Sequence, residues 1–179
     1  MEKTKIKNLV LIPLFSIIIS VCAWICIPSV IPFTLQTFGV FFTLLYLGGK
    51  RGTISVSLYI ALGAIGFPFF SGGTGGFGIL FGATGGFIFG MLLIAVVFWL
   101  FEKYARNIKN RETTSLLVGL LFCYFFGVLQ FYAFWSAEGD SVTLLQIFTI
   151  YIIPYLLPDL LKIYLAIYFD KKIKKFISD

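Results

Sequence analysis

Long apolar runs alternate with short polar connectors along the whole chain. A membrane-spanning helix needs roughly 20 predominantly apolar residues. The runs predict six spans within a single domain, residues 1–179, at about 8–27, 36–49, 52–67, 80–101, 114–135 and 155–173. Residues 142–153 form a further short apolar run, which is typical of a re-entrant or interfacial segment. The pattern therefore predicts an all-α integral membrane protein.

The composition agrees with a membrane protein. Hydrophobic residues make up 59% of the chain and charged residues 12%, values outside the range of soluble globular domains. The net charge of +6 reflects where the cations lie between the predicted spans. Thirteen of the fourteen fall on one side: Lys3, Lys5, Lys7, Lys50, Arg51, Lys103, Arg106, Lys109, Arg111, Lys171, Lys172, Lys174 and Lys175.

By the positive-inside rule the basic side is cytoplasmic, so we expect both termini in the cytoplasm. The connectors 28–35, 68–79 and 136–154 then face outward, and Glu138 and Asp140 lie outside. The basic excess is explained by the lipid bilayer, and we expect no nucleic-acid partner.

The residue types present weaken most catalytic hypotheses. The chain has no histidine, so neither a zinc site with histidine ligands nor a Cys/His nucleophile can form. Cys22, Cys26 and Cys123 lie in apolar segments, as small buried hydrophobic residues do. No segment has the spacing of a phosphate-binding loop. We expect no catalytic residue, no metal and no cofactor, and any ATP hydrolysis must come from another protein.

Asp159 and Lys162 lie within the last apolar run and project from one helix face. An ionisable side chain at a helix centre in the membrane costs about 2.5 to 3.5 kcal/mol, so such residues are candidates for function. Pro154 and Pro158 suit a first helical turn, which predicts a helix start near 155–158 and places the pair near the outer face. The alternative is a structural ion pair. Asp159 would accept from ligand N–H groups and Lys162 would hold a ligand carboxylate, and the sequence leaves open which group takes which.

Two outward connectors supply uncharged candidates for ligand binding. The connector before the second span ends in Thr34, Gln36 and Thr37, whose alternative role is helix capping or bonding to a neighbouring span. The Gly-rich connector offers backbone amides and hydroxyls at Gly72, Gly73, Thr74, Gly75, Gly76, Gly78 and Thr84. Phe69, Phe70 and Phe77 are expected to close an apolar wall over the ligand.

Two stripes of small residues are predicted to bring helices close together. Gly82, Gly86 and Gly90 recur every four residues, and we favour helix packing over ligand contact for them. Ser16, Ser20 and Ala23 form a second stripe on the first span, either for a partner helix or for internal packing.

Five segments in order resemble the BioY family, the biotin-specific substrate-capture subunits of energy-coupling factor (ECF) transporters. They are 31–37 (IPFTLQT), 47–52 (LGGKRG), 66–76 (GFPFFSGGTGG), 82–86 (GATGG) and 158–162 (PDLLK). Ala83 stands where the family usually has proline, and Ser16 and Ser20 replace the alanines of its partner-binding stripe.

The resemblance implies a six-helix bundle of the ECF S-component type in the bacterial plasma membrane. It implies high-affinity capture of biotin from outside and docking onto a transmembrane coupling subunit that carries two ATPase subunits. ATP turnover would then topple the bundle and release biotin inside. The alternatives are capture of thiamine or riboflavin, a small membrane enzyme with Asp159 as base, and a structural subunit without a ligand.

Overall fold

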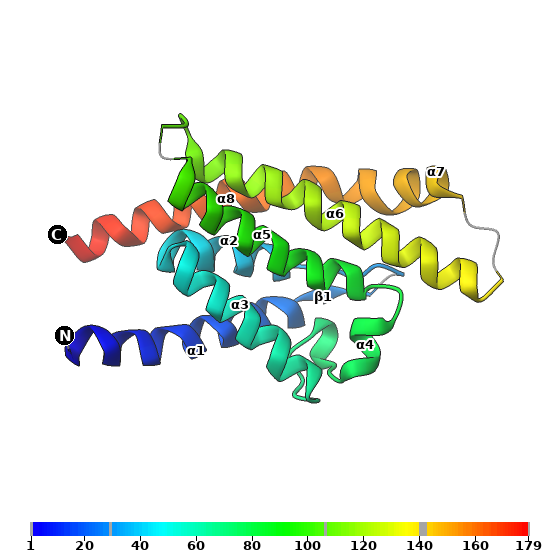
Figure 1. The fold of residues 1–179 in the computed structure, drawn as a ribbon, viewed down its shortest axis with the longest axis horizontal. Coiled ribbons are helices and arrows are strands. Elements are labelled where there is room, and N and C mark those ends of the chain that lie inside the picture. Colours follow the sequence, from blue (N-terminus) through cyan, green and yellow to red (C-terminus); the bar gives the residue numbers. More distant parts are fainter. Residues whose placement is uncertain (1, 29, 106, 140–142, 179) are drawn as a thin grey trace.

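The computed structural model describes residues 2–28, 30–105, 107–139 and 143–178, and helices make up most of it (Figure 1). The first half contains α1 (Glu2–Trp24), β1 (Cys26–Ile27), β2 (Phe33–Thr34), α2 (Gln36–Leu47) and α3 (Gly49–Ala64). The Gly-rich connector contains a 3-10 turn, η1 (Ser71–Gly73), and a short helix, α4 (Phe77–Phe81). The second half contains α5 (Gly85–Tyr104), α6 (Arg111–Ala137), α7 (Leu144–Gln146), the π-helix η2 (Ile147–Ile152) and α8 (Ile153–Ser178).

Six of these helices overlap the six apolar runs of the sequence. Among the described residues, α5 and α6 are each long and apolar enough to cross a membrane. A third span is obtained if the bent pair Leu144–Ile150 and Ile153–Ile177, inclined by 47°, counts as one. Residues Leu9–Trp24 of α1, and α2, are shorter apolar helices. The structure therefore establishes a helical membrane-type bundle, and the count of six spans remains a proposal.

The last helix, α8, begins at Ile153, two residues before the predicted start near 155–158. Helical backbone also runs from Leu144 through η2 into α8 with a bend of 47°, which is typical of a broken span or a re-entrant segment, so the separate segment expected over this run stays a prediction. Pro154 occupies the first turn of α8, where a missing N–H is tolerated, and Pro158 lies inside it. The wider turns of a π-helix and the bend redistribute the hydrogen bonds that these prolines interrupt. Val142 lies outside the described residues.

The helices α5 and α6 form the closest pair, and glycines make their approach possible. A Cβ atom at Gly90 would lie 2.6 Å from Sγ of Cys123, and one at Gly119 would lie 2.8 Å from Cα of Ile94. Gly86 likewise abuts the α6 backbone, whereas Gly82 precedes α5. The packing role predicted for Gly86 and Gly90 is confirmed.

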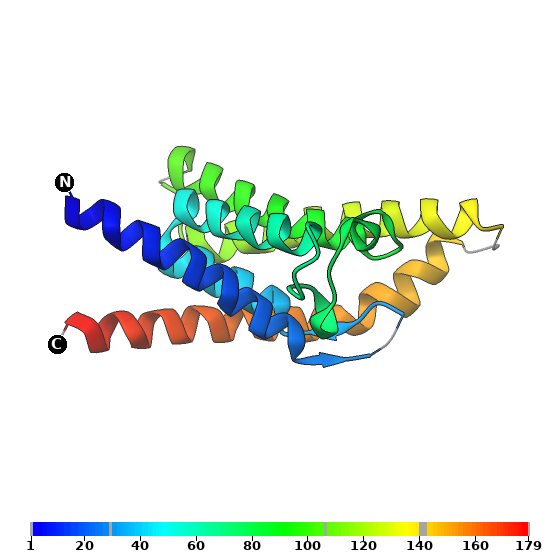
Figure 2. The ribbon, with the colours of Figure 1, turned by 90° about the horizontal axis from the view of Figure 1, so that it is seen from below.

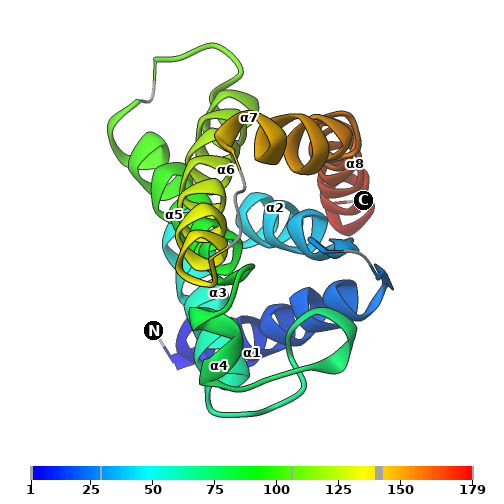
Figure 3. The same cartoon turned by 90° about the vertical axis from the view of Figure 1, so that its right-hand side faces the viewer.

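Figures 2 and 3 show α1 beside α2 and α3, and α8 beside α2. Both termini lie at one end of the bundle, together with the connector between α5 and α6 (Figure 1). The α4 region and the C-terminal end of α6 lie toward the opposite end (Figure 1). Arg106 and Asp140, which the charge argument used, lie outside the described residues.

Candidate functional site

A cavity of about 360 Å³ lies where α2, α5, α6 and α8 meet beneath the β1–β2 hairpin and the Gly-rich connector. Its wall is largely apolar, with polar side chains contributed by the start of α2, the Gly-rich connector, α6 and α8. Ligand pockets in proteins have volumes of roughly 300 to 1,000 Å³ and this same character. The lining residues are Ile31, Pro32, Thr34, Gln36, Thr37, Phe70, Ser71, Thr74, Ile79, Thr84, Phe87, Ile88, Met91, Leu120, Cys123, Tyr124, Tyr155, Asp159 and Lys162.

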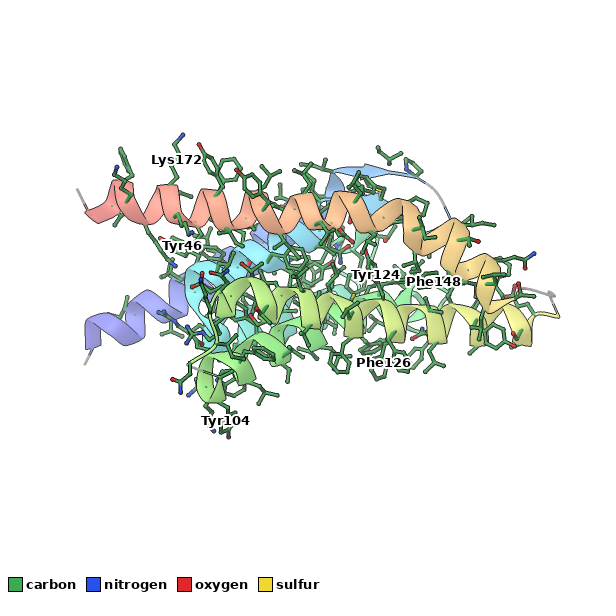
Figure 4. The ribbon with its side chains drawn as sticks, turned by 90° about the horizontal axis from the view of Figure 1, so that it is seen from above. Tyr46, Tyr104, Tyr124, Phe126, Phe148 and Lys172 are labelled. Carbon is green, nitrogen blue, oxygen red and sulfur yellow. The ribbon has the colours of Figure 1, made fainter. Side chains whose placement is uncertain are left out.

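The charged part of the wall is a hydrogen-bonded cluster centred on Asp159. Nζ of Lys162 donates to Oδ1 of Asp159 across 2.8 Å, and both residues are at most 5% exposed. Thr37, at the start of α2, donates its hydroxyl to the same oxygen at 2.9 Å. Tyr124 of α6 donates to Oδ2 of Asp159 at 2.6 Å. Figure 4 shows Tyr124 in the space between α6 and α8.

Counting donors shows what this cluster can still accept. An ionised carboxylate has about four lone-pair positions, two on each oxygen. Oδ1 of Asp159 already receives Thr37 and Lys162, whereas Oδ2 receives Tyr124. Nζ of Lys162 also donates to Oγ1 of Thr37 at 3.1 Å and lies 4.5 Å from the centre of the Phe33 ring. The cluster thus keeps an acceptor position on Oδ2, while the lysine is already directed at three groups.

A second polar group, the side chain of Gln36, lies deeper between the helices. Its Nε2 donates to the hydroxyl of Tyr59 at 2.6 Å and to Sδ of Met91 at 3.2 Å. The backbone N–H of Gln36 donates to Oγ1 of Thr34 at 3.2 Å, so Thr34 supports the start of α2. The structural alternative from the sequence is confirmed for these side chains, and because they also line the cavity their role in ligand binding stays a prediction.

The Gly-rich connector contributes through a few side chains. Phe70, Thr74 and Thr84 line the cavity as predicted. Phe70 is 1% exposed and rests on Gly63, where any side chain would overlap its ring. The connector is tied to α1 by a hydrogen bond from Nε1 of Trp24 to the carbonyl of Pro68 at 2.7 Å.

The glycines of the connector lie behind this wall. Gly72, Gly73, Gly75, Gly76 and Gly78 are not among the residues that line the cavity. Their backbone shapes the connector, because Gly72, Gly73 and Gly76 have positive φ and Gly76 donates to the carbonyl of Gly63 at 2.7 Å. The expected wall of three phenylalanines is wrong, because Phe77 is 61% exposed and Phe69 packs behind the cavity on Tyr59. Phe70 alone of the three lines the cavity.

The small-residue stripe on α1 faces inward. Ser16, Ser20 and Ala23 are at most 2% exposed. Oγ of Ser16 donates to the carbonyl of Ser55 at 2.8 Å, which joins α1 to α3. Their burial favours the internal-packing alternative, and the partner-binding role of these three residues stays a prediction.

Sequence reasoning missed Tyr124 and Tyr155, which both line the cavity. The hydroxyl of Tyr155 donates to the carbonyl of Ile31 and so joins α8 to the hairpin. A tyrosine in an apolar run carries no sign of its partner, since Tyr124 is 35 residues from Asp159 in sequence. Among the described residues, no group of three or more His, Cys, Asp or Glu side chains could hold a metal ion.

Comparisons with known proteins show the family of this chain. The model of the BioY family matches residues 1–179. "Biotin transporter BioY" of Thermotoga maritima is 34% identical over 171 residues, covering 94% of this chain and 96% of that protein. "Biotin transporter BioY" of Rhodobacter capsulatus is 33% identical over 168 residues, and the match covers 88% of this chain and 87% of that protein.

A crystal structure of "the S-component for biotin from an ECF-type ABC transporter" has the same fold. It superposes with a TM-score of 0.83 at 27% identity, covering 98% of this chain and 94% of that one.

Proposed function

The chain belongs to the BioY family, and on that basis we propose that it is the biotin-binding membrane subunit of an ECF-type importer. It captures biotin from outside the cell and delivers it inward when it is coupled to a transmembrane subunit and two ATPases. The observation that carries the proposal is the Asp159 cluster in the wall of an otherwise apolar cavity. The relatives named as biotin transporters support the same substrate.

Biotin matches the cavity in chemistry. Its fused rings are largely apolar and suit Phe70, Phe87 and Ile88, whereas its ureido group presents N–H donors and a carbonyl acceptor. A buried acceptor that lacks a partner is costly, so the open position on Oδ2 of Asp159 favours a ligand with an N–H group. A charge-assisted bond of this kind is roughly twice as strong as a neutral one.

The hydrogen bonds also suggest how biotin is oriented. The ureido ring lies against Asp159 and Tyr124, because Oδ2 of Asp159 keeps an acceptor position there. Lys162 acts mainly by neutralising Asp159 and fixing its orientation, since its ammonium group is already directed at Asp159, Thr37 and the Phe33 ring. The carboxylate tail then points toward the Gly-rich connector, where the hydroxyls of Thr74 and Thr84 line the cavity.

In the proposed site the direct contacts come from eight residues predicted by the sequence that also line the cavity. They are Thr34, Gln36, Thr37, Phe70, Thr74, Thr84, Asp159 and Lys162. Tyr124 and Tyr155 join them. The glycines at 72, 73, 75, 76 and 78 act indirectly, because they let the connector adopt the path that places Phe70 and Thr74 in the cavity wall.

We extend the proposal to topology. Six helices, α1, α2, α3, α5, α6 and α8, span the membrane as one domain, with both termini in the cytoplasm. The shared end of the two termini and the positive-inside rule support this orientation. The cavity then opens to the outside. The partners are the coupling subunit and its two ATPases, and the chain itself is a transporter subunit and not an enzyme.

Calorimetric titration of the detergent-purified protein with biotin, thiamine and riboflavin tests the proposal. We expect saturable binding of biotin at a ratio of one per chain and no binding of the other two vitamins. Protein carrying Asp159→Asn is the control for binding in this cavity. Wild-type protein that gives no heat with biotin, or prefers another vitamin, contradicts the proposal.

A further inference from the structure

The connection between α2 and α3 contains a divided hydrogen bond at the end of the bundle away from the cavity. In a continuous helix the N–H of Gly49 would donate to the carbonyl of Leu45, four residues earlier. The chain turns instead at Gly48, whose φ is +79°, and α3 begins in a new direction. Both halves of the lost bond therefore need other partners.

Glu102 of α5 takes the N–H half. Its Oε2 accepts from the N–H of Gly49 at 2.6 Å, so a carboxylate caps the first turn of α3. The approach is close, because a Cβ atom at Gly49 would lie 2.7 Å from the same oxygen. Glu102 thus joins α3 to α5.

Lys174 of α8 takes the carbonyl half. Its Nζ donates to the carbonyl of Leu45 at 2.9 Å and to Oδ2 of Asp170 at 2.8 Å. A cation at a helix C-terminus is favourable, and here the cation comes from a different helix. Asp170 is 3% exposed, and its Oδ1 is buried without a hydrogen-bond partner. Lys174 thus joins α2 to α8.

This arrangement is an unfavourable way to gain stability. Asp170 is buried, but the side chain of Lys174 is 49% exposed, so the ion pair is partly solvated and adds little stability, while Oδ1 of Asp170 remains unsatisfied. Its value therefore lies in geometry, since it fixes where the end of α2 sits along α8. The register of α8 against α2 bears directly on the cavity, because Thr37 of α2 must reach Asp159 of α8.

The Thr37–Asp159 contact and the Lys174–Leu45 contact both lie on the seam between α2 and α8. Asp170 follows Asp159 by 11 residues, which places it about 16 Å further along α8 and within about 20° of the same face. Between them the seam is apolar, with Ile163 and Ala166 buried in the core. Apolar packing of this kind tolerates small shifts along the helix axis, whereas a bond from Lys174 to one particular carbonyl does not.

We propose that Lys174, held by Asp170, is a positioning residue for ligand binding. By fixing the end of α2 on α8, it keeps Thr37 in register with Asp159 at the far end of the seam. Glu102 makes the corresponding contact between α3 and α5. It does not affect the register of α8 against α2. The inference rests on the proposed binding of biotin.

A double-mutant cycle on biotin affinity, measured by calorimetry, tests the inference. Lys174→Met is expected to weaken binding about fivefold in the wild-type background and less than about twofold in the Thr37→Val background, because the register no longer matters once the Thr37 hydroxyl is gone. Glu102→Gln and Thr37→Val are expected to act additively. A loss of global stability would be additive with Thr37→Val, so it does not imitate the predicted pattern.

Controls separate charge from position. Lys172→Met removes the same charge from the same helix end, and Figure 4 shows Lys172 pointing away from the bundle. Lys172→Met should leave biotin affinity unchanged. Lys174→Arg, which keeps the charge and the donors, should bind biotin with close to wild-type affinity. Asp170→Asn, which keeps the size of the side chain, serves in the same cycle if Lys174→Met does not fold. The inference is overturned if Lys174→Met leaves biotin affinity unchanged, or if its effect is additive with that of Thr37→Val. The proposed function is unaffected by either result as long as the wild-type protein binds biotin.

Discussion

The hydroxyl of Tyr124 donates a hydrogen bond of 2.6 Å to Oδ2 of Asp159, and this bond links α6 to α8 across the cavity. Few other contacts join these two helices, so the pair forms part of the cavity wall between them. Asp159 therefore accepts hydrogen bonds from residues on three helices. The donors are Thr37 of α2, Tyr124 of α6 and Lys162 of α8. A carboxylate held this way is oriented before any ligand arrives.

Tyr124→Phe should weaken biotin binding about tenfold, equivalent to about 1.4 kcal/mol. The change removes one donor from Asp159 and also the hydroxyl oxygen, which can accept from the ureido group. Calorimetry on the purified variant measures the effect. Tyr132→Phe, on the same helix but absent from the cavity wall, is the matched control. Equal affinities for wild type and Tyr124→Phe would remove the tyrosine from the site.

Asp159→Asn and Lys162→Ala should each weaken binding at least about tenfold, because each breaks the charged cluster. Asp159→Asn also leaves the Lys162 ammonium buried without its counter-ion, which should lower the free energy of unfolding by about 3 kcal/mol. Adding Lys162→Met to Asp159→Asn should recover thermal stability without recovering binding. Thermal unfolding followed by tryptophan fluorescence, together with calorimetry, separates the two effects. Recovery of binding in the double variant would mean that the pair is structural.

Gly63→Ala should reduce both stability and affinity, because the added methyl group overlaps the Phe70 ring that lines the cavity. Overpacking of this kind costs about 1 to 3 kcal/mol. Gly78→Ala is the informative comparison, since no atom lies within 4 Å of a Cβ there. We expect its biotin affinity to stay within about twofold of wild type. A large loss for Gly78→Ala would show that this glycine meets the ligand, as the sequence suggested.

The polar members of the site were predictable from the sequence because they stand out in an apolar chain. Asp159 and Lys162 are conspicuous in a hydrophobic run, and prolines nearby place them close to one end of a helix. Thr37 and Gln36 were recognised in the same way at the start of α2. Tyr124 was missed, because tyrosines are ordinary in apolar runs and its partner lies on another helix.

Sequence patterns were less informative about direction. A stripe of small residues predicts close approach but not which neighbour approaches, and Ser16 turned out to face α3. Glycines in the connector predict unusual backbone angles, which Gly72 and Gly76 have, but not the course of the connector relative to the cavity. The start of the last helix was predicted to within about two residues from Pro154 and Pro158, but the π-helical turns that join it to the preceding apolar run carry no sequence signal.

Because Ser16 is buried, we propose that a coupling subunit would dock on the other face of α1. Ser16 is fully buried and bonded to Ser55, so Ser16→Trp should disrupt packing and lose both biotin binding and thermal stability. Ile17 is 51% exposed on the neighbouring face, together with Leu14 and Val21. Ile17→Trp should therefore keep wild-type affinity in calorimetry. If the coupling subunit docks on this face, the same variant should abolish uptake of labelled biotin by cells that supply the coupling subunit and ATPases.

The two readouts distinguish the possible arrangements of α1. Ile17→Trp with normal binding and normal uptake would place the coupling subunit elsewhere on the bundle. Ser16→Trp with normal binding would mean that α1 turns about its axis in the membrane, because the buried contact to Ser55 leaves no room for an indole. Ile17→Ala, which shortens the side chain on the same face, separates a blocked surface from a lost contact. Uptake that survives Ile17→Ala but not Ile17→Trp identifies steric exclusion of the partner helix.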